Sequence, residues 1–372
     1  MELNSINSLV ELFFKKYEEK RSAQNQIFLR WLKDEKRNTF TWQQVKNNII
    51  ALSEYLKKNL IKGDRCVLLS ENRPEWFIAD IAIMNAGGVT VPLFTTYSEK
   101  DYEYILNDCK PKICIVSNNI QFKKIKKFIS NETIVLTIEN VNENMMNFEN
   151  IIKNHSEKNV TFSYDYNKEI ERKNLACIIY TSGTTGNPKG VMLSHGGILS
   201  NCEGAQEILN SLVKTDKPIF LTWLPLSHSY EHTVQYVQIS LGATIFYAES
   251  LEKLLPNISI AKPTIMTAVP RFYQNLYSKI NLNFSKQKGF KKKLIENTIK
   301  FGTKKLNKER LNFNEMIIDF FCELLVRKKI KSQFGGKLKA FVSGGGALDQ
   351  KIGEFLNSIG LPTLQGYGLT ET

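Results

Sequence analysis

The spacing of hydrophobic residues changes repeatedly from residue 64 onward. Short runs of apolar, mostly β-branched residues alternate with longer segments in which apolar residues recur every three or four positions. The short runs are typical of buried strands, and the longer pattern is typical of amphipathic helices. Strands that alternate with helices form βαβ units around a mostly parallel sheet. The sequence therefore predicts an α/β fold class, with stacked, mostly parallel sheets and flanking helices.

The first of these units shows where elements begin and end. A strand is predicted at 64–70, a helix at 74–86 and a second strand at 88–93. Pro74 fits the first turn of a helix because its missing N–H would have no partner there, and Gly87 fits the end of the helix.

The same alternation continues along the chain. It predicts strands at 113–117, 133–138, 218–222, 243–247, 264–268 and 338–343, and helices at 98–108, 121–130, 196–211, 250–255, 271–280 and 349–359. The stretch 139–173 is polar and weakly patterned, so we expect a connecting excursion there.

The length of the chain limits its organisation. Its 372 residues exceed the size at which a single hydrophobic core stops growing. We expect one large domain over 1–372, with sub-lobes at about 1–173 and 174–372. Two long helical segments, at 289–307 and 315–334, are predicted to form a helical insertion at about 281–337.

Composition favours a cytoplasmic protein. The N-terminus lacks the basic start and apolar core of a signal peptide, and no uninterrupted apolar run reaches roughly 18 residues. The six cysteines form no Cys-x-x-Cys pair and several lie in apolar runs, so we expect reduced, buried thiols. They are Cys66, Cys109, Cys114, Cys177, Cys202 and Cys322.

The net charge of +13 indicates either a nucleic-acid partner, an anionic membrane or a basic solvated surface. Most of the excess is lysine, and asparagine and isoleucine are also frequent, so a compositional drift of the genome explains much of it. We predict no nucleic-acid partner. In the segment 289–307, apolar residues are interspersed with lysines, as in a helix that lies on an anionic membrane surface. A solvated helix that packs on the main domain is the alternative.

The stretch that most clearly indicates chemistry follows the apolar strand 177–180. It consists of Thr181, Ser182, Gly183, Thr184, Thr185, Gly186, Asn187, Pro188, Lys189 and Gly190. Small hydroxyl residues beside glycines let successive N–H groups point toward one phosphate, and Lys189 adds a positive charge. The P-loop of nucleotide triphosphatases requires Gly-Lys-Ser/Thr in succession, which this stretch lacks. The residues alone indicate a nucleotide-phosphate site, with a flexible turn as the alternative.

Residues 180–190, with 191–195 after them, resemble the phosphate loop of the AMP-forming acyl-CoA synthetases, which share a superfamily with adenylation domains and luciferases. The resemblance extends from about residue 30 to residue 372. It implies the N-terminal, adenylate-forming part of a long-chain fatty acid–CoA ligase. In that reaction a carboxylate attacks the α-phosphate of ATP, and the acyl-adenylate then forms a thioester with coenzyme A. The implied ligands are a fatty acid, ATP, Mg²⁺ and coenzyme A.

Two segments near the end of the chain match further motifs of this family. Residues 343–348 resemble its adenine-binding turn, although a tight strand-to-helix turn would need glycines as well. The segment 365–371 is more specific, since the resemblance implies that Tyr367 stacks on adenine, Thr370 contacts phosphate or the substrate carboxylate, and Glu371 binds magnesium. Open α/β sheets bind ligands at the carboxyl ends of strands, so we expect both segments to converge with the phosphate loop in one crevice.

Residues 224–228, Leu-Pro-Leu-Ser-His, match a family segment whose last residue lies near the acyl carboxylate and the thiol tunnel. A lone histidine is otherwise structural, and we expect His195 to be structural. Residues 267–273 resemble the long-chain branch, where they start a helix beside the acyl pocket, although Pro270 in a first helical turn explains them equally well. The helical insertion also favours long-chain enzymes.

These motifs define the predicted site. The predicted nucleotide-binding residues are Thr181, Ser182, Gly183, Thr184, Thr185, Gly186, Lys189, Gly344, Gly345, Gly346, Ala347, Gln365, Gly366, Tyr367, Gly368 and Thr370. The predicted catalytic residues are Thr184, Lys189, His228, Thr370 and Glu371, with Thr184 and Glu371 as the predicted magnesium ligands.

The family normally continues beyond the motif at 365–371. The resemblance implies an acidic residue that holds the ribose, a hinge, and a small C-terminal domain with a catalytic lysine. None has a counterpart in the 372 residues, so we expect a fragment that binds ATP weakly and makes little adenylate alone. A catalytically inactive nucleotide-binding module and an adenylation domain that loads a carrier protein are the alternatives.

Overall fold

The computed structural model describes residues 2–33, 38–141, 145–156, 166–182, 186–213 and 217–371. Internal contacts divide the chain into two compact units. Unit 1 comprises Met1–Leu209, Pro225–Tyr247 and Thr370–Thr372, and unit 2 comprises Asn210–Leu224 and Ala248–Leu369. The predicted sub-lobes follow sequence order, whereas here the chain leaves unit 1 and later returns to it.

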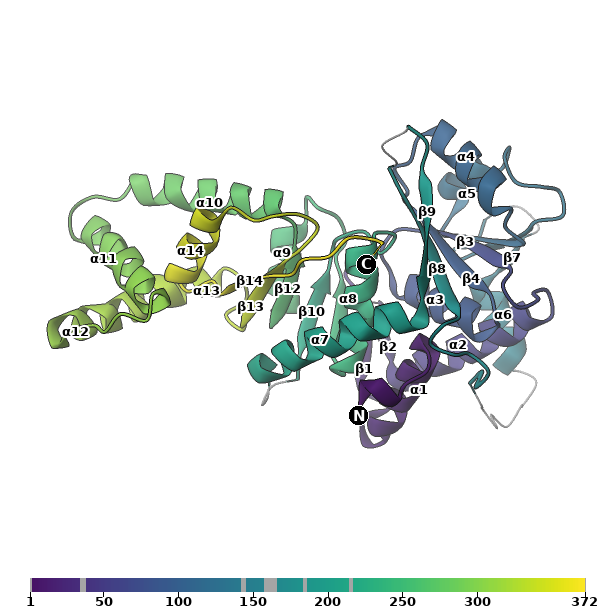
Figure 1. Ribbon diagram of the computed structural model, residues 1–372, viewed down its shortest axis with the longest axis horizontal. Coiled ribbons are helices and arrows are strands. Elements are labelled where there is room, and N and C mark those ends of the chain that lie inside the picture. The colour runs from purple at the N-terminus through teal and green to yellow at the C-terminus, as the bar shows by residue number, and fades with distance from the viewer. Residues whose placement is uncertain are drawn as a thin grey trace. The chain divides into compact units, whose positions relative to one another are not determined.

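Unit 1 contains a seven-stranded sheet in the order β7-β6-β5-β3-β4-β8-β9 (Figure 1). All neighbouring strands are parallel except β8 and β9, which are antiparallel. The strands are β3 (Arg65–Leu69), β4 (Val89–Leu93), β5 (Ile113–Val116), β6 (Ile134–Thr137), β7 (Met146–Asn147), β8 (Leu175–Thr181) and β9 (Lys189–Ser194). Strands β4 and β5 are buried along their whole length, which explains their unbroken apolar runs.

Three further strands of unit 1 pair with one another. Strand β1 (Ile27–Trp31) is parallel to β11 (Thr244–Tyr247) and antiparallel to β2 (Asn38–Thr41). The helices of this unit are α1 (Leu9–Glu19), α2 (Trp42–Lys57), α3 (Pro74–Asn85), α4 (Glu99–Cys109), α5 (Asn119–Ile125), α6 (Phe148–Ser156) and α8 (Ser229–Ser240), and α7 (His195–Val213) begins here. Short 3₁₀ turns lie at Leu3–Ser5 and Arg21–Ala23.

Unit 2 contains four parallel strands in the order β14-β13-β12-β10. They are β10 (Ile219–Thr222), β12 (Ile265–Ala268), β13 (Ala340–Ser343) and β14 (Thr363–Gln365). Its helices are α9 (Leu254–Ala261), α10 (Pro270–Ser285), α11 (Gly289–Leu306), α12 (Phe313–Cys322), the π-helical turn η3 (Glu323–Arg327), α13 (Lys328–Ser332) and α14 (Gln350–Ser358). The predicted class, mostly parallel sheets with flanking helices, is confirmed.

Two local predictions were wrong. The stretch 139–173 contains β7 and α6, because Phe148 and Ile151 are buried although the segment is polar overall. The helix predicted at 250–255 lies instead at Leu254–Ala261. Pro256 lacks an N–H and is tolerated only in the first turn of a helix, which fixes the start of α9 at Leu254.

A buried polar cluster joins α8 to α3. Asp80 on α3 is fully buried, accepts a hydrogen bond from the hydroxyl of Tyr236, and lies 3.0 Å from Nε2 of His232. Burial alone would raise the pKa of Asp80, but the charge and hydrogen bond of His232, together with Tyr236, hold it below its usual value. These contacts fix α8, and with it the residues at the N-terminus of that helix.

All six cysteines are buried and free, as predicted. Burial raises the pKa of their thiols, for example to about 12 at Cys109. Among the residues that the structure describes, no helix combines the length and the apolar character that crossing a bilayer requires.

Candidate functional site

The predicted phosphate loop joins the antiparallel strands β8 and β9 of unit 1. Tyr180 is opposite Gly190, and Thr181 is opposite Lys189. The predicted residues Gly183, Thr184 and Thr185 lie outside the described residues. Of the others, Ser182, Gly186 and Lys189 are exposed and Thr181 is partly buried. Gly186 has a φ of 92°, a conformation that strongly favours glycine.

The base of this hairpin is held firmly. A Cβ atom at Gly190 would lie 3.0 Å from Cγ2 of Ile178 and 3.1 Å from Cζ of Tyr180, so glycine gives the tyrosine ring room across the strand pair. The hydroxyl of Tyr180 donates to Asp108, and the hydroxyl of Tyr97 donates to the carbonyl of Tyr180 over 2.9 Å. Sequence reasoning missed both partners, because they lie more than 70 residues before Tyr180.

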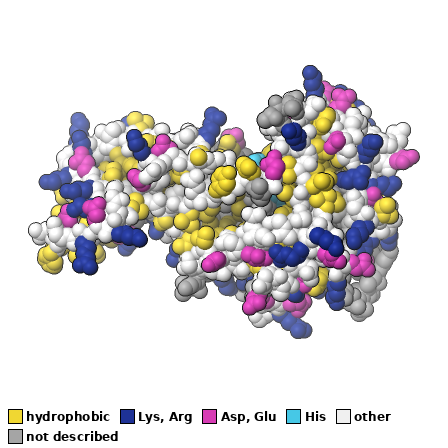
Figure 2. Space-filling view, in the orientation of Figure 1, with side chains coloured by type: hydrophobic (Ala, Val, Ile, Leu, Met, Phe, Trp, Pro, Cys, Tyr) yellow, Lys and Arg dark blue, Asp and Glu magenta, His cyan; other side chains and the backbone are white. Residues whose placement is uncertain are grey.

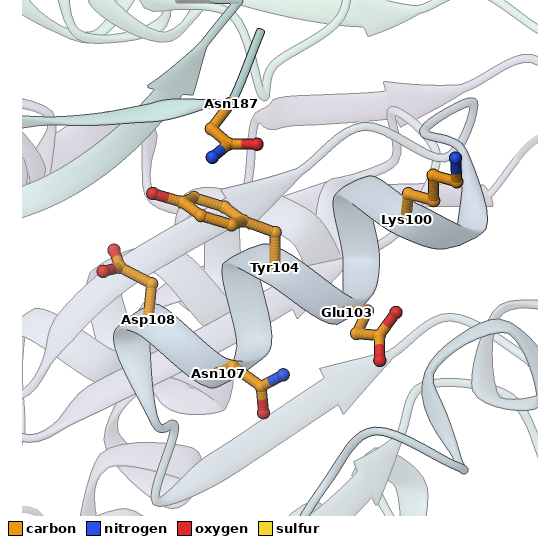
Figure 3. A pocket seen from close by; sticks show the side chains of 6 residues that line it. All are labelled: Lys100, Glu103, Tyr104, Asn107, Asp108 and Asn187. Carbon is orange, nitrogen blue, oxygen red and sulfur yellow. The ribbon is translucent and has the colours of Figure 1, made fainter.

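A shallow, open pocket of about 510 Å³ lies between the loop and α4. It is lined by Lys100, Glu103, Tyr104, Asn107, Asp108 and Asn187. Figure 3 shows Asn187 above the ring of Tyr104, with the other side chains along α4. Two carboxylates against one lysine do not favour an anion, so we expect the phosphate to bind elsewhere on the loop.

Two of the predicted segments meet at the N-terminus of α8. The hydroxyl groups of Ser229 and Thr370 lie 2.9 Å apart. Just before them, the N–H of Leu226 donates to Oδ1 of Asn72 over 3.0 Å, which fixes the turn that leads into the helix. The structure therefore brings Thr370 next to the predicted residue His228.

The ring of His228 caps α8. Its Nδ1 accepts a hydrogen bond from the N–H of Tyr230 over 3.2 Å, and the ring meets Phe94 edge to face at 6.3 Å between centroids. The ring has exposed surface, but the protein around it displaces water and lowers its pKa. At neutral pH the ring is therefore neutral, with its proton on Nε2, and Nε2–H can donate a hydrogen bond.

In unit 2 the turn at 344–346, which we call the glycine turn, lies next to the segment that follows β14. Ser343 is opposite Gln365 in the parallel strands β13 and β14, and the N–H of Gly366 donates to the carbonyl of Ser343 over 2.8 Å. Both segments therefore lie at the carboxyl ends of adjacent strands, as predicted. Gly345 has a φ of 73°, which favours glycine at this turn.

An aromatic side chain at this edge of the sheet is open to a ligand. The ring of Tyr367 is 91% exposed. The hydroxyl of Ser343 is buried and has no hydrogen-bond partner among the described residues. An exposed aromatic ring near a backbone turn free of bulky side chains at 344–346 fits a planar heterocycle. Convergence with the phosphate loop stays a prediction, because that loop belongs to unit 1.

The predicted magnesium ligands are less well defined. Glu371 is exposed, and Thr184 lies outside the described residues. No group of three or more His, Cys, Asp or Glu side chains in the described ranges could hold a metal ion. Magnesium binds few protein oxygens together with phosphate oxygens and waters, so a single carboxylate still fits it when phosphate is present.

His195 does not belong to this site. It begins α7, is 2% exposed, and its Nδ1 accepts a hydrogen bond from the N–H of Leu9 over 3.2 Å. Burial lowers its pKa from 6.5 to about 4. These contacts agree with the structural role expected from the sequence.

We expect this histidine to make the protein acid-labile. Its folded pKa is depressed, so its contribution to stability is complete above about pH 6.5 and is lost as the pH falls toward about 4. The loss should be on the order of 3 kcal/mol in the free energy of unfolding. Urea unfolding at several pH values measures it. His195→Asn, which keeps an acceptor for Leu9, should flatten the profile, and an unchanged slope in this variant would contradict the assignment.

Comparisons with known proteins show which family the chain resembles. The family model for the AMP-binding enzyme matches residues 16–372. A fatty acyl-CoA synthetase A from Dictyostelium discoideum is 30% identical over 91% of the chain and 52% of its own length. Long chain acyl-CoA synthetase 3 from Arabidopsis thaliana is 28% identical over 91% of the chain and 53% of its own length. The chain thus spans about half the length of these relatives.

Solved structures share the fold. The structure of ATP-bound MatB from Rhodopseudomonas palustris matches with a TM-score of 0.68 and 20% identity, covering 99% of this chain and 61% of its own chain. At that identity the match shows a common fold only.

Proposed function

Because the chain belongs to the family of AMP-binding enzymes, we propose that it contributes the nucleotide and acyl sites of a long-chain fatty acid–CoA ligase. The oxygen of the fatty-acid carboxylate attacks the α-phosphate of ATP and pyrophosphate leaves. The thiol of coenzyme A then attacks the acyl carbon, and AMP leaves. The similarity to acyl-CoA synthetases supports this substrate class.

The observation that most supports the proposal is the pairing of the glycine turn with the segment after β14. The carboxyl ends of parallel strands are where open α/β sheets bind ligands. We propose that adenine lies on the backbone of residues 344–347 and stacks on Tyr367. Gln365, Gly366 and Gly368 lie within two residues of Tyr367 and would border the stacked adenine.

The other residues have roles that follow from their chemistry. The loop at 181–190 binds phosphate oxygens through its N–H and hydroxyl groups, and Lys189 neutralises part of their charge. His228 donates from Nε2 toward the acyl carboxylate, and Ser229 orients Thr370 beside it. When bound beside Glu371 and Thr184, Mg²⁺ would supply further charge neutralisation on the phosphates.

We also propose that the protein acts in the cytoplasm. Six buried, free thiols support a reducing compartment.

Replacing Tyr367 tests the adenine site directly. Tyr367→Ala should weaken ATP binding about tenfold, because stacking of a base on an aromatic side chain contributes roughly 1–3 kcal/mol. Tyr367→Phe keeps the ring and should bind ATP like the original chain. Isothermal titration with ATP measures both affinities. Equal affinities for the Ala and Phe variants would remove Tyr367 from the site, and no ATP binding by the unaltered chain would count against the proposed function.

A further inference from the structure

In the helical insertion, the exposed apolar residues lie mostly on α12 and not on the basic helix α11. The sequence left two interpretations of the basic helix at 289–307, a helix on an anionic membrane surface and a helix that packs on the main domain. In the structure this helix, α11, buries the middle of its apolar stripe, since Leu294 is 8% exposed and Phe301 is 3% exposed. It lies against α12 and α14. Among the apolar residues of this stripe, the exposed ones are Phe290 and Leu306, at the two ends of the helix.

The neighbouring helix α12 turns its charged side toward the protein and its apolar side outward, which is the reverse of an ordinary surface helix. Its inner side holds charged groups: Glu315 pairs with Lys304 at 2.7 Å, and Asp319 pairs with Lys305 and with Arg327, the latter at 2.8 Å. Burial alone would raise the pKa of Asp319, but these two cations hold it below its usual value. The charged residues of α12 are thus directed toward the protein.

The outer side of α12 and the first turn of η3 is apolar. Six residues that are between 46% and 76% exposed form it, and we name them the α12 face. They are Phe313, Met316, Ile317, Phe320, Phe321 and Leu324. Relative to Phe313, their spacings of three, four, seven, eight and eleven residues place them on one side of a helix. A soluble helix normally turns such a stripe inward, so this stripe is built to meet another apolar phase.

The charged residues around the α12 face indicate which apolar phase it meets. Exposed basic residues outnumber exposed acidic ones at both ends of the α12 face: Lys308 and Arg310 flank Glu309 before it, and Lys328 and Lys329 follow Glu323 after it. Figure 2 shows Lys and Arg side chains over α11 and α12, interspersed with Asp and Glu side chains and beside hydrophobic ones. An apolar stripe between basic residues suits the headgroup region of an anionic bilayer. Two copies of the face would bring like charges together, which disfavours self-association.

We propose that the α12 face inserts into the interfacial layer of a bilayer that contains anionic lipid. The basic residues at its ends contact the headgroups, and the ion pairs of Asp319 hold α12 on the protein while its apolar side enters the lipid.

Vesicle binding by the 372-residue chain tests the proposal. The chain should bind phosphatidylcholine vesicles that contain phosphatidylglycerol, and should bind pure phosphatidylcholine vesicles weakly. Phe313→Glu with Phe320→Glu should lower the vesicle partition coefficient tenfold or more, since the change removes two large apolar side chains from the lipid and adds two negative charges beside anionic headgroups. Lys328→Gln and Lys329→Gln should each lower it about fivefold. Ile120→Glu, at a residue that is 68% exposed on α5, is the matched control and should bind unchanged.

A second measurement separates insertion from misfolding and from self-association. All six native cysteines are buried, so the thiol in Phe320→Cys can be labelled selectively with an environment-sensitive fluorophore. Anionic vesicles should shift its emission to the blue, and the same label in Ile120→Cys should not respond. The proposal is overturned if both labels respond alike, if the Glu variants bind vesicles as before, or if light scattering without lipid shows a dimer that Phe320→Glu dissociates.

Discussion

Lys189→Ala should lower the rate of fatty-acid-dependent ATP–pyrophosphate exchange by about two orders of magnitude, which is the effect of losing one preorganised charge. Lys189 is exposed at the start of β9, opposite Thr181, where the hairpin base is fixed by Tyr180 and Tyr97. The backbone that carries Lys189 is therefore fixed beside the loop, and its ammonium group can reach phosphate oxygens bound there. The exchange rate is measured in a version of the protein as long as its relatives, and ATP affinity is measured in the 372-residue chain.

The control for this variant is Lys100→Ala. Lys100 lies in the pocket beside Asn187 and has the same charge, but we expect no phosphate there. Its exchange rate should stay within about twofold of the original, since an isolated surface charge contributes little. If Lys189→Ala exchanges pyrophosphate at the original rate, the hairpin loop does not bind the phosphates of ATP.

The second large effect concerns the acid that is activated. In the version of the protein that is as long as its relatives, kcat/KM should rise steeply from acetate to octanoate and remain high for palmitate. Each methylene buried in an apolar pocket contributes roughly 0.8 kcal/mol, or about fourfold in kcat/KM, until the pocket is filled. Comparing the three acids in an assay for AMP release measures this directly.

Other outcomes of that comparison would change the assignment. A preference for acetate would exclude the long-chain substrate while leaving adenylation intact. Activation of an amino acid, with transfer to a carrier protein and none to coenzyme A, would favour an adenylation domain. Dodecylamine offers a matched control, because it has the apolar chain but no carboxylate to attack the α-phosphate.

The sequence by itself determined the local elements and the chemical motifs. Pro74 begins α3, the apolar run at 113–116 is a buried strand, and the glycines at 344–346 form the turn after β13, all as predicted. These features depend on residues close in sequence, where backbone restrictions and hydrophobic spacing act directly. The phosphate loop could be proposed for the same reason, since its predicted chemistry lies within ten consecutive residues.

Only the tertiary structure decided how distant segments meet. The contact of Ser229 with Thr370, the hydrogen bond of Tyr180 to Asp108, and the burial of Asp80 against α8 join residues 72 to 156 positions apart. No spacing rule encodes such pairs, because they depend on which elements become neighbours in the sheet. The same holds for α12. Its amphipathic sequence does not say which side faces the protein. In the structure, the pairs of Glu315 with Lys304 and of Asp319 with Lys305 and Arg327 place its charged side inward and its apolar side outward.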